Sequence, residues 1–114
     1  MNQESSAVLI SIHKKYSDKI FEGTKKFEFR KNKLGKNTKR IYVYESKSDI
    51  KDKLIGYFLT DENIKKIPLT EILNYIKKHP KESGIDYETA KEYYRGHEYG
   101  YMYPILKINK FRID

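Results

Sequence analysis

Three β-prone runs follow one another between residues 24 and 60, with only short connections between them. They are Thr24–Lys31, Arg40–Glu45 and Leu54–Thr60, and all are rich in aromatic or branched side chains. The connections leave no room for the crossover helices that join parallel neighbours in a doubly wound sheet. We therefore expect an α+β fold with a curled, mixed or antiparallel sheet. Closing such a sheet into a small barrel would remove its exposed edges.

Two further strands are expected outside this region, which gives about five in all. Ala7–Ile12 is a short apolar run and is predicted to be a central strand. Tyr99–Ile113 returns to β character near the end of the chain. Pro104 interrupts this run, and because proline has no backbone N–H, the strand should be bulged or lie at an edge there. Gly56 lies inside the third run and predicts a bulge or a close backbone approach.

Two to three helices complete the expected fold. His13–Glu22 is one, and a second follows the helical spacing of apolar residues between Pro68 and Pro80. Asp86 is predicted to be the N-cap of the last helix, with Tyr94 on its buried side. The chain has the length of one domain with one core, so we expect residues 1–114 to form a single domain.

Several classes of protein are disfavoured by what the sequence lacks. The chain has no cysteine, which excludes disulfides and thiolate metal sites and suits the cytoplasm. No apolar run is long enough to cross a membrane, and the first residues show no signal-peptide pattern. His13, His79 and His97 have no metal-ligand spacing and are interpreted as structural or exposed. We expect no metal, no cofactor and no membrane partner.

The positive excess of the chain is concentrated between Lys14 and Arg40. This segment holds eleven lysine or arginine residues and three acids, so its net charge is +8, which equals that of the whole chain. A generally lysine-rich composition would spread the excess evenly. A concentrated positive face attracts polyanions such as nucleic acids and speeds their arrival. The alternative interpretation is a patch that serves solubility.

The strand after Gly23 alternates aromatic and charged residues. Phe27 and Phe29 are expected to point inward, while Lys26, Glu28 and Arg30 form a row of charged heads that faces outward. Glu28 and Arg30 share a face, so an acceptor and a rigid fork of donors lie side by side. Such a pair can grip a planar polar ligand or a phosphate. The alternative is a solvated face with a weak surface ion pair.

Lys25 is the candidate catalytic residue if the protein is an enzyme. It could contact phosphate, or act as a nucleophile if burial lowered its pKa, with Lys26 and Arg30 helping to lower it. An exposed lysine is the usual case, and we favour it over catalysis. The sequence therefore indicates binding through Lys25 more than chemistry at Lys25.

The spacing Gly23-x-Lys25-x-x-Glu28-x-Arg30 resembles the GxKxxExR signature of the ASCH domain, which belongs to the PUA-like superfamily of small β-barrels. Other stretches resemble the family's first strand, its third strand, the next strand with its glycine and its aromatic-rich last helix: Leu9–Ile12, Ile41–Tyr44, Leu54–Gly56 and Tyr93–Gly96. The resemblance covers nearly the whole chain. It departs from the family at Tyr103-Pro104, where the family runs on without proline.

The resemblance implies a small PUA-like mixed β-barrel with a cleft beside the signature strand. The cleft would be roofed by the loop at Ser46–Lys53 and by the last helix. PUA-like domains are similar in binding RNA, often with a modified or flipped-out base. Ser11 is close to the signature in this resemblance, and Tyr44, Tyr93 and Tyr101 could stack on bases. The predicted ligand-binding residues are Ser11, Lys25, Lys26, Glu28, Arg30, Tyr44, Tyr93 and Tyr101.

We interpret the chain first as an RNA-binding or nucleotide-recognising module, regulatory in translation or transcription. The alternative is a hydrolase that acts on RNA or on modified nucleosides, either a ribonuclease or an amidohydrolase of N4-acetylcytidine. Relatives with the amidohydrolase activity have a threonine where this chain has Glu28, which counts against that reading. A further alternative is a regulator that binds other proteins.

Overall fold

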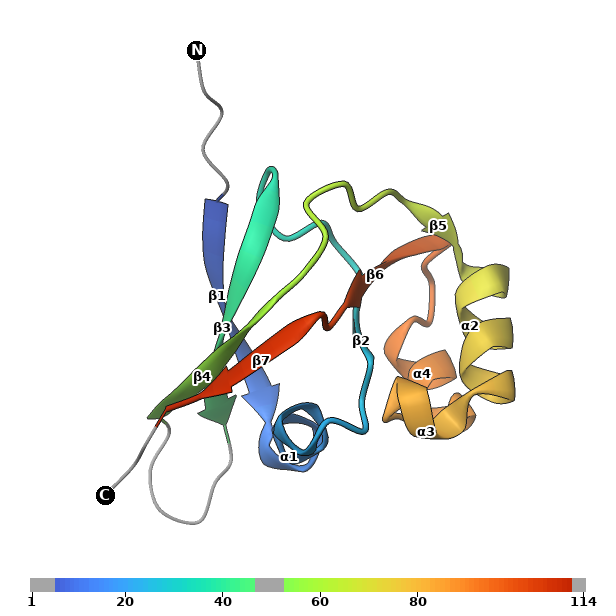
Figure 1. Ribbon diagram of the computed structural model, residues 1–114. Helices are drawn as coiled ribbons and strands as arrows, with labels where there is room; N and C mark the ends of the chain where they lie inside the picture. Colours follow the sequence, from blue (N-terminus) through green and yellow to red (C-terminus); the bar gives the residue numbers. More distant parts are fainter. Residues whose placement is uncertain (1–5, 47–52, 112–114) are drawn as a thin grey trace.

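The computed structural model describes residues 6–46 and 53–111 (Figure 1). Within these residues the chain forms seven strands and four helices in two sheets, an α+β arrangement. The larger sheet has the order β1-β3-β4-β7, and the smaller has the order β2-β6-β5. The strands of the larger sheet are Ser6–His13 (β1), Thr38–Ser46 (β3), Lys53–Leu59 (β4) and Lys107–Lys110 (β7). Those of the smaller sheet are Phe27–Arg30 (β2), Ile67–Pro68 (β5) and Tyr99–Pro104 (β6).

Strand β1 lies at the edge of its sheet, so the expectation of a central strand was wrong. Among the described strands it pairs only with β3, in parallel, whereas β3–β4 and β4–β7 are antiparallel. Its side chains alternate between the two faces: Ile10 and Ile12 are buried, while Leu9 is 62% exposed. One face of β1 therefore belongs to the core and the other to the surface. Its free edge is left facing the smaller sheet and the last helix.

The described residues form four helices where two to three were expected, and three of the four begin and end close to the predicted points. They are Lys14–Glu22 (α1), Leu69–Lys78 (α2), Pro80–Ser83 (α3) and Tyr87–Tyr93 (α4). Gly23 ends α1 in the left-handed conformation, with φ of 87°, as expected for a C-terminal glycine. The Asp86 carboxylate accepts a hydrogen bond from the Thr89 N–H, which confirms the predicted cap. Among the described residues, no helix is long and apolar enough to cross a membrane.

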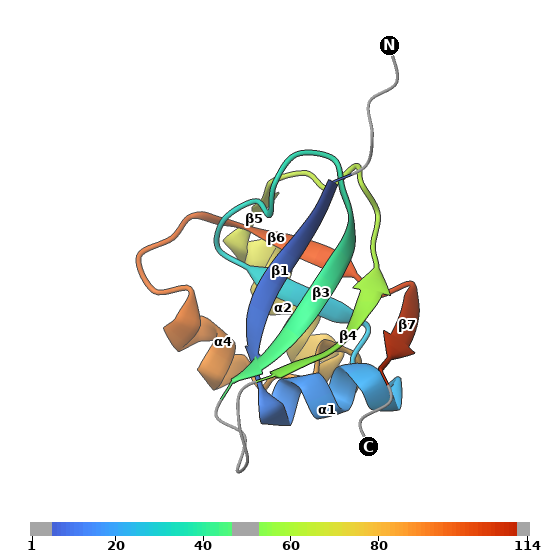
Figure 2. The ribbon, with the colours of Figure 1, turned by 90° about the vertical axis from the view of Figure 1, so that its left-hand side faces the viewer.

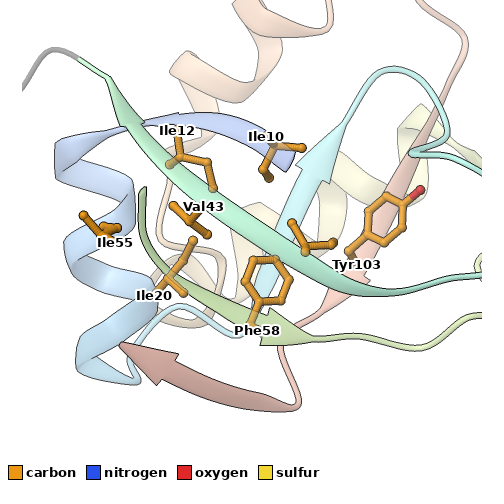
Figure 3. Packing of buried hydrophobic residues seen from close by; sticks show 8 residues of the cluster. Ile10, Ile12, Ile20, Val43, Ile55, Phe58 and Tyr103 are labelled. Atoms are coloured by element: carbon orange, nitrogen blue, oxygen red, sulfur yellow. The ribbon is translucent and has the colours of Figure 1, made fainter. Parts of the chain in front are cut away.

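Two apolar clusters lie on either side of β2. The first lies between the larger sheet and α1 and includes Ile20, Val43, Phe58 and Tyr103 (Figure 3). The second joins Phe29 of β2 to α2 and α4. Because β2 has packed neighbours on both faces, it is not a strand with one solvated side. This arrangement explains why Glu28 of β2 is also buried.

The two sheets do not close into a barrel, which corrects the expected PUA-like barrel of about five strands. The last β segment is divided at Pro104 into two strands that serve different sheets: β6 pairs with β2 and β5, and β7 pairs with β4. At the corner, the Ile105 N–H donates to the Lys26 carbonyl and the Leu106 N–H to the Leu59 carbonyl. The chain thus crosses from one sheet to the other without continuous pairing. The strand count is higher than expected because of this division and because of the short β5.

Gly56 has both of the properties expected of it. The register of β3 and β4 shifts between Val43 and Tyr44, next to the pairing of Val43 with Gly56. A Cβ atom on Gly56 would lie 2.8 Å from the Phe21 ring of α1 and against the Asn109 backbone of β7. Only glycine therefore lets α1 and β7 approach β4 so closely.

Candidate functional site

A cavity of about 220 Å³ opens between the edge strands β1 and β2 and the helix α4. It lies between an edge strand of the larger sheet and an edge strand of the smaller one. β1 contributes residues Ser11–His13, β2 contributes Glu28, Phe29 and Arg30, and α4 contributes Thr89, Ala90 and Tyr93. The remaining lining residues are Tyr16, Lys25, Ile85 and Tyr94. The gap between the sheets thus becomes a pocket.

Lys25 is held in place both by its backbone and by the end of its side chain. Its backbone N–H donates to the Lys19 carbonyl after the end of α1. Its Nζ donates a 2.6 Å hydrogen bond to the Ser83 carbonyl oxygen at the end of α3. The aliphatic stem passes over Gly84, where a Cβ atom would lie 2.7 Å from Lys25 Cγ. The residue is only 3% exposed, so the expected exposed lysine is instead a buried one.

Burial lowers the pKa of Lys25 from its ordinary value to about 8. The nearby Glu28 carboxylate opposes this shift because it favours the charged ammonium, and Lys19 adds to the shift by repulsion. The sequence pointed to Lys26 and Arg30 as the residues that would lower it, but neither is among the causes. Near neutral pH a fraction of Lys25 is therefore an unprotonated amine. A neutral amine can act as a base or nucleophile.

Glu28 lies between two cations on one side of the cavity. Its Oε1 is 3.9 Å from Lys25 Nζ, and its Oε2 is 3.2 Å from Arg30 Nη1. Glu28 is buried, which contradicts the predicted outward row of charged heads. The reason is that the second face of β2 packs toward Tyr103 and the first cluster. Two positive groups and one negative group leave the cavity with a net positive charge.

Arg30 is the most open member of this group. Its side chain is 28% exposed, compared with 3% for Lys25 and 9% for Glu28. Its backbone carbonyl accepts a hydrogen bond from the Tyr94 hydroxyl, which fixes the strand against α4 and the turn after it. The guanidinium can therefore meet a ligand at the mouth of the cavity while Glu28 keeps it oriented.

Aromatic rings line the cavity beside this charged group. Tyr16 comes from α1, Phe29 from β2 and Tyr93 from α4. Tyr93 packs edge-on against Tyr94, with ring centroids 4.8 Å apart, and Lys31 Nζ lies 4.5 Å from the Tyr93 ring centroid. Burial raises the pKa of Tyr93, so its hydroxyl stays protonated and remains a donor.

The structure brings five of the predicted binding residues into the cavity and leaves three outside it. Ser11, Lys25, Glu28, Arg30 and Tyr93 line it. Lys26 is exposed, and its backbone carbonyl meets Ile105 at the sheet corner. Tyr44 lies beside Ser11 on the outward face of the larger sheet, and Tyr101 lies opposite Arg30 on β6. The predicted roof loop includes residues 47–52, which lie outside the described residues.

Sequence reasoning missed Tyr16, Thr89 and His13 as lining residues. Thr89 could have been found, because it lies four residues before Tyr93 and thus on the same face of α4. His13 is exposed, as expected, and stands at the N-cap position of α1 beside the cavity, without a side-chain cap hydrogen bond. Tyr16 was assigned to the apolar side of α1, and only the three-dimensional placement of α1 shows that it reaches the cavity.

Comparison with solved structures shows that the chain has the fold of an ASCH domain. The crystal structure of ASCH from Zymomonas mobilis superposes with a TM-score of 0.74 at 20% identity, over 91% of this chain and 69% of that one. A crystallised serine-to-alanine mutant of it gives 0.74 at 21% identity, over 91% and 70%. A tyrosine-to-phenylalanine mutant gives 0.67 at 17% identity, over 93% and 75%. The sequence matches no protein-family model and no curated protein.

Proposed function

We propose that this chain is an ASCH module that binds RNA by taking one base or nucleotide into the cavity between β1, β2 and α4. The observation that supports this most directly is the Lys25–Glu28–Arg30 group, which lies beside aromatic rings in one pocket. Aromatic faces offer stacking to any base, and the charged group offers both an acceptor and donors. Neither feature alone would suggest a nucleotide.

The chemistry of the charged group fits the edge of a base. Glu28 can accept a hydrogen bond from an exocyclic amino group, and Arg30 can donate to a neighbouring carbonyl or ring nitrogen. The net positive charge also tolerates a phosphate at the mouth, next to Arg30. A volume of about 220 Å³ is below the usual range for sites of drug-sized ligands, roughly 300–1,000 Å³. The cavity therefore suits one ring, with the rest of the RNA outside.

The basic segment from Lys14 to Arg40 includes the charged residues of the cavity, and it supplies a nonspecific contribution to binding. Contacts between lysine or arginine and phosphates release counterions, so affinity should fall steeply with added salt. Binding that is insensitive to salt over a wide range would contradict this part of the proposal.

The test is the affinity of Arg30→Ala for a fluorescein-labelled oligoribonucleotide pool, measured by fluorescence anisotropy. We expect a loss of about 5- to 150-fold, as for a lost base contact of roughly 1–3 kcal/mol. Lys26→Ala is the matched control, because Lys26 is basic and exposed but lies outside the cavity. It should weaken binding only slightly. Equal affinities of Arg30→Ala and the unmodified protein, with the fold intact by circular dichroism, would refute the proposal.

A second candidate function is hydrolysis of RNA or of a modified nucleoside, and the buried Lys25 supports it. With its pKa lowered to about 8, the amine could take a proton from the attacking water. The rate should then rise with pH through about 8, as the neutral amine accumulates. Incubation of the pure protein with RNA and with N4-acetylcytidine, followed by product analysis, tests this. Turnover that Lys25→Met abolishes would establish catalysis, and silence on all substrates would favour the binder.

A further inference from the structure

The outer face of the larger sheet is not covered by any described helix (Figure 2). The inner face of this sheet holds the first apolar cluster, with Ile10, Ile41 and Phe58. The strand registers place two rows of residues side by side on the outer face. One row consists of Leu9, Tyr42, Tyr57 and Asn109, and the next consists of Ala7, Arg40, Leu59 and Lys107.

Aromatic rings cross this outer face as a connected group. The centroids of Tyr42 and Tyr57 are 5.5 Å apart, and those of Tyr57 and Phe111 are 6.1 Å apart. Asn109 Nδ2 donates to the Tyr57 hydroxyl at 3.3 Å. These contacts fix the rings in place, so a ligand that stacks on them would not have to order them first.

Arg40 lies at the centre of the group. Its guanidinium carbon is 4.4 Å from the Tyr57 ring centroid, and its Nη1 donates to the Tyr42 hydroxyl at 3.4 Å. A guanidinium placed over a ring can offer its own plane to a base and its N–H edge to a phosphate. A depression of about 500 Å³ adjoins it, lined by Ser6, Ala7, Lys39, Arg40, Tyr42 and Leu59.

The charges of this face specify the kind of partner. Among the outward positions of the described strands there are Arg40 and Lys107 but no aspartate or glutamate. A second copy of this chain, packed by twofold symmetry, would bring these positive groups together without acids to pair them. A polyanion with flat rings satisfies both the charges and the aromatic group, and single-stranded nucleic acid has that chemistry.

We propose that the outer face of the β1-β3-β4-β7 sheet, centred on Arg40, Tyr42 and Tyr57, is a second binding surface, which holds single-stranded RNA outside the cavity. Ser11 connects the two surfaces, because it lines the cavity and pairs with Tyr44 of the outer face. An RNA strand can therefore run along the sheet and over the edge strand β1 into the cavity. The choice of RNA rests on the proposed function, whereas the surface itself does not depend on the cavity.

Tyr42→Leu tests this surface with a fluorescein-labelled oligouridine. We expect a loss of affinity of about tenfold or more, as for the loss of one stacked base. Tyr99→Leu is the control: Tyr99 is exposed, whereas Tyr42 is half-buried, and it lies under a cation, Lys66, but belongs to the smaller sheet. Its affinity should equal that of the unmodified protein. Arg40→Gln, a surface change, should reproduce the loss if Tyr42→Leu does not fold.

Photocrosslinking of the same oligouridine, mapped by mass spectrometry, should label peptides that contain Tyr42 or Tyr57. If Arg30→Ala loses binding while Tyr42→Leu and Arg40→Gln keep it, the second surface is refuted and the cavity proposal stands. If Tyr42→Leu and Arg40→Gln lose binding while Arg30→Ala keeps it, the cavity proposal is refuted and the outer face is supported. If Tyr42→Leu changes only the oligomeric state in sedimentation, the face is a contact between copies, and the RNA proposal is overturned.

Discussion

The Nζ of Lys25 donates a 2.6 Å hydrogen bond to the carbonyl oxygen of Ser83, 58 residues away in the sequence. This bond joins the segment before β2 to the end of α3. The Lys26 N–H, one residue later, donates to the Glu82 carbonyl and strengthens the same junction. Lys25 therefore lines the cavity and also connects the segment before β2 to α3. Variants at this position change stability as well as binding.

Gly84→Ala should destabilise the domain in two ways, through the unfavourable backbone conformation and through the contact of the added Cβ atom with Lys25. Gly84 has φ of 66°, and a Cβ atom there would lie 2.7 Å from Lys25 Cγ. Gly96→Ala is the matched control, because Gly96 has φ of 82° but no atom within 4 Å of an added Cβ. Each variant should lose about 1–2 kcal/mol from the positive φ. In urea titrations Gly84→Ala should lose a further 1–3 kcal/mol, roughly the cost of overpacking; equal losses would show that Lys25 simply moves aside.

The contribution of Lys25 to the stability of the domain should rise between pH 8 and pH 10. Its pKa is about 8 in the folded protein and 10.5 when exposed, so in this interval the unfolded chain binds more protons than the folded one. Stability increases with pH where that is so, by up to about 3 kcal/mol for a shift of this size. Well below pH 8 both states are protonated and the contribution is flat.

The comparison for this pH effect is Lys25→Met, which keeps the apolar stem but cannot titrate. The difference in unfolding free energy between the two proteins should shift in favour of the unmodified chain as pH rises from 7 to 10. Tyrosines are common to both proteins, so their titration cancels. A difference that stays constant over this interval would show that Lys25 keeps an ordinary pKa.

Glu28→Gln should lower the pKa of Lys25 further. Glu28 is the group that favours the charged ammonium, and its removal leaves Lys25 and Arg30 without an anion between them. We expect a loss of stability of about 1–3 kcal/mol from the unpaired buried groups. The pH at which stability begins to rise should also move below 8. An unchanged pH profile would contradict the coupling between Glu28 and Lys25.

The α+β class, most element positions and the capping residues could be predicted because they depend on local chemistry. Gly23 and Asp86 are examples, since their conformation and hydrogen bonds involve only near neighbours. The open arrangement of the sheets could not be predicted. It depends on where the chain changes sheets, and Pro104 indicated an interruption but not that its two sides pair with different partners.

The proximity of Lys25, Glu28 and Arg30 could be predicted, but the environment of this group could not. The spacing of Lys25, Glu28 and Arg30 placed them together, yet period-two alternation put Glu28 in solvent. The alternation of apolar and charged residues distinguishes the two faces of a strand but does not show whether either face is exposed to solvent. β2 has packed neighbours on both faces. The burial of Lys25 depends on Ser83 and Gly84, which are too distant in sequence for any local pattern to reveal.

The last prediction concerns a buried pair that holds α1, and with it Tyr16, against the larger sheet. The Ser17 hydroxyl donates to Glu45 Oε2 at 2.6 Å, and both residues are buried. Ser17→Ala removes that donor and should lower the free energy of unfolding by about 1–3 kcal/mol. The buried carboxylate then loses a hydrogen bond, and water cannot reach it to take the place of the hydroxyl. Replacing both residues, as in Ser17→Ala with Glu45→Met, should cost less than the sum of the single changes, since no buried polar group is left unpaired. Urea denaturation of the four proteins in this cycle measures the coupling. Strictly additive losses would mean that the Ser17 hydroxyl, which also lies 3.1 Å from the Lys14 carbonyl, serves the helix and not the sheet.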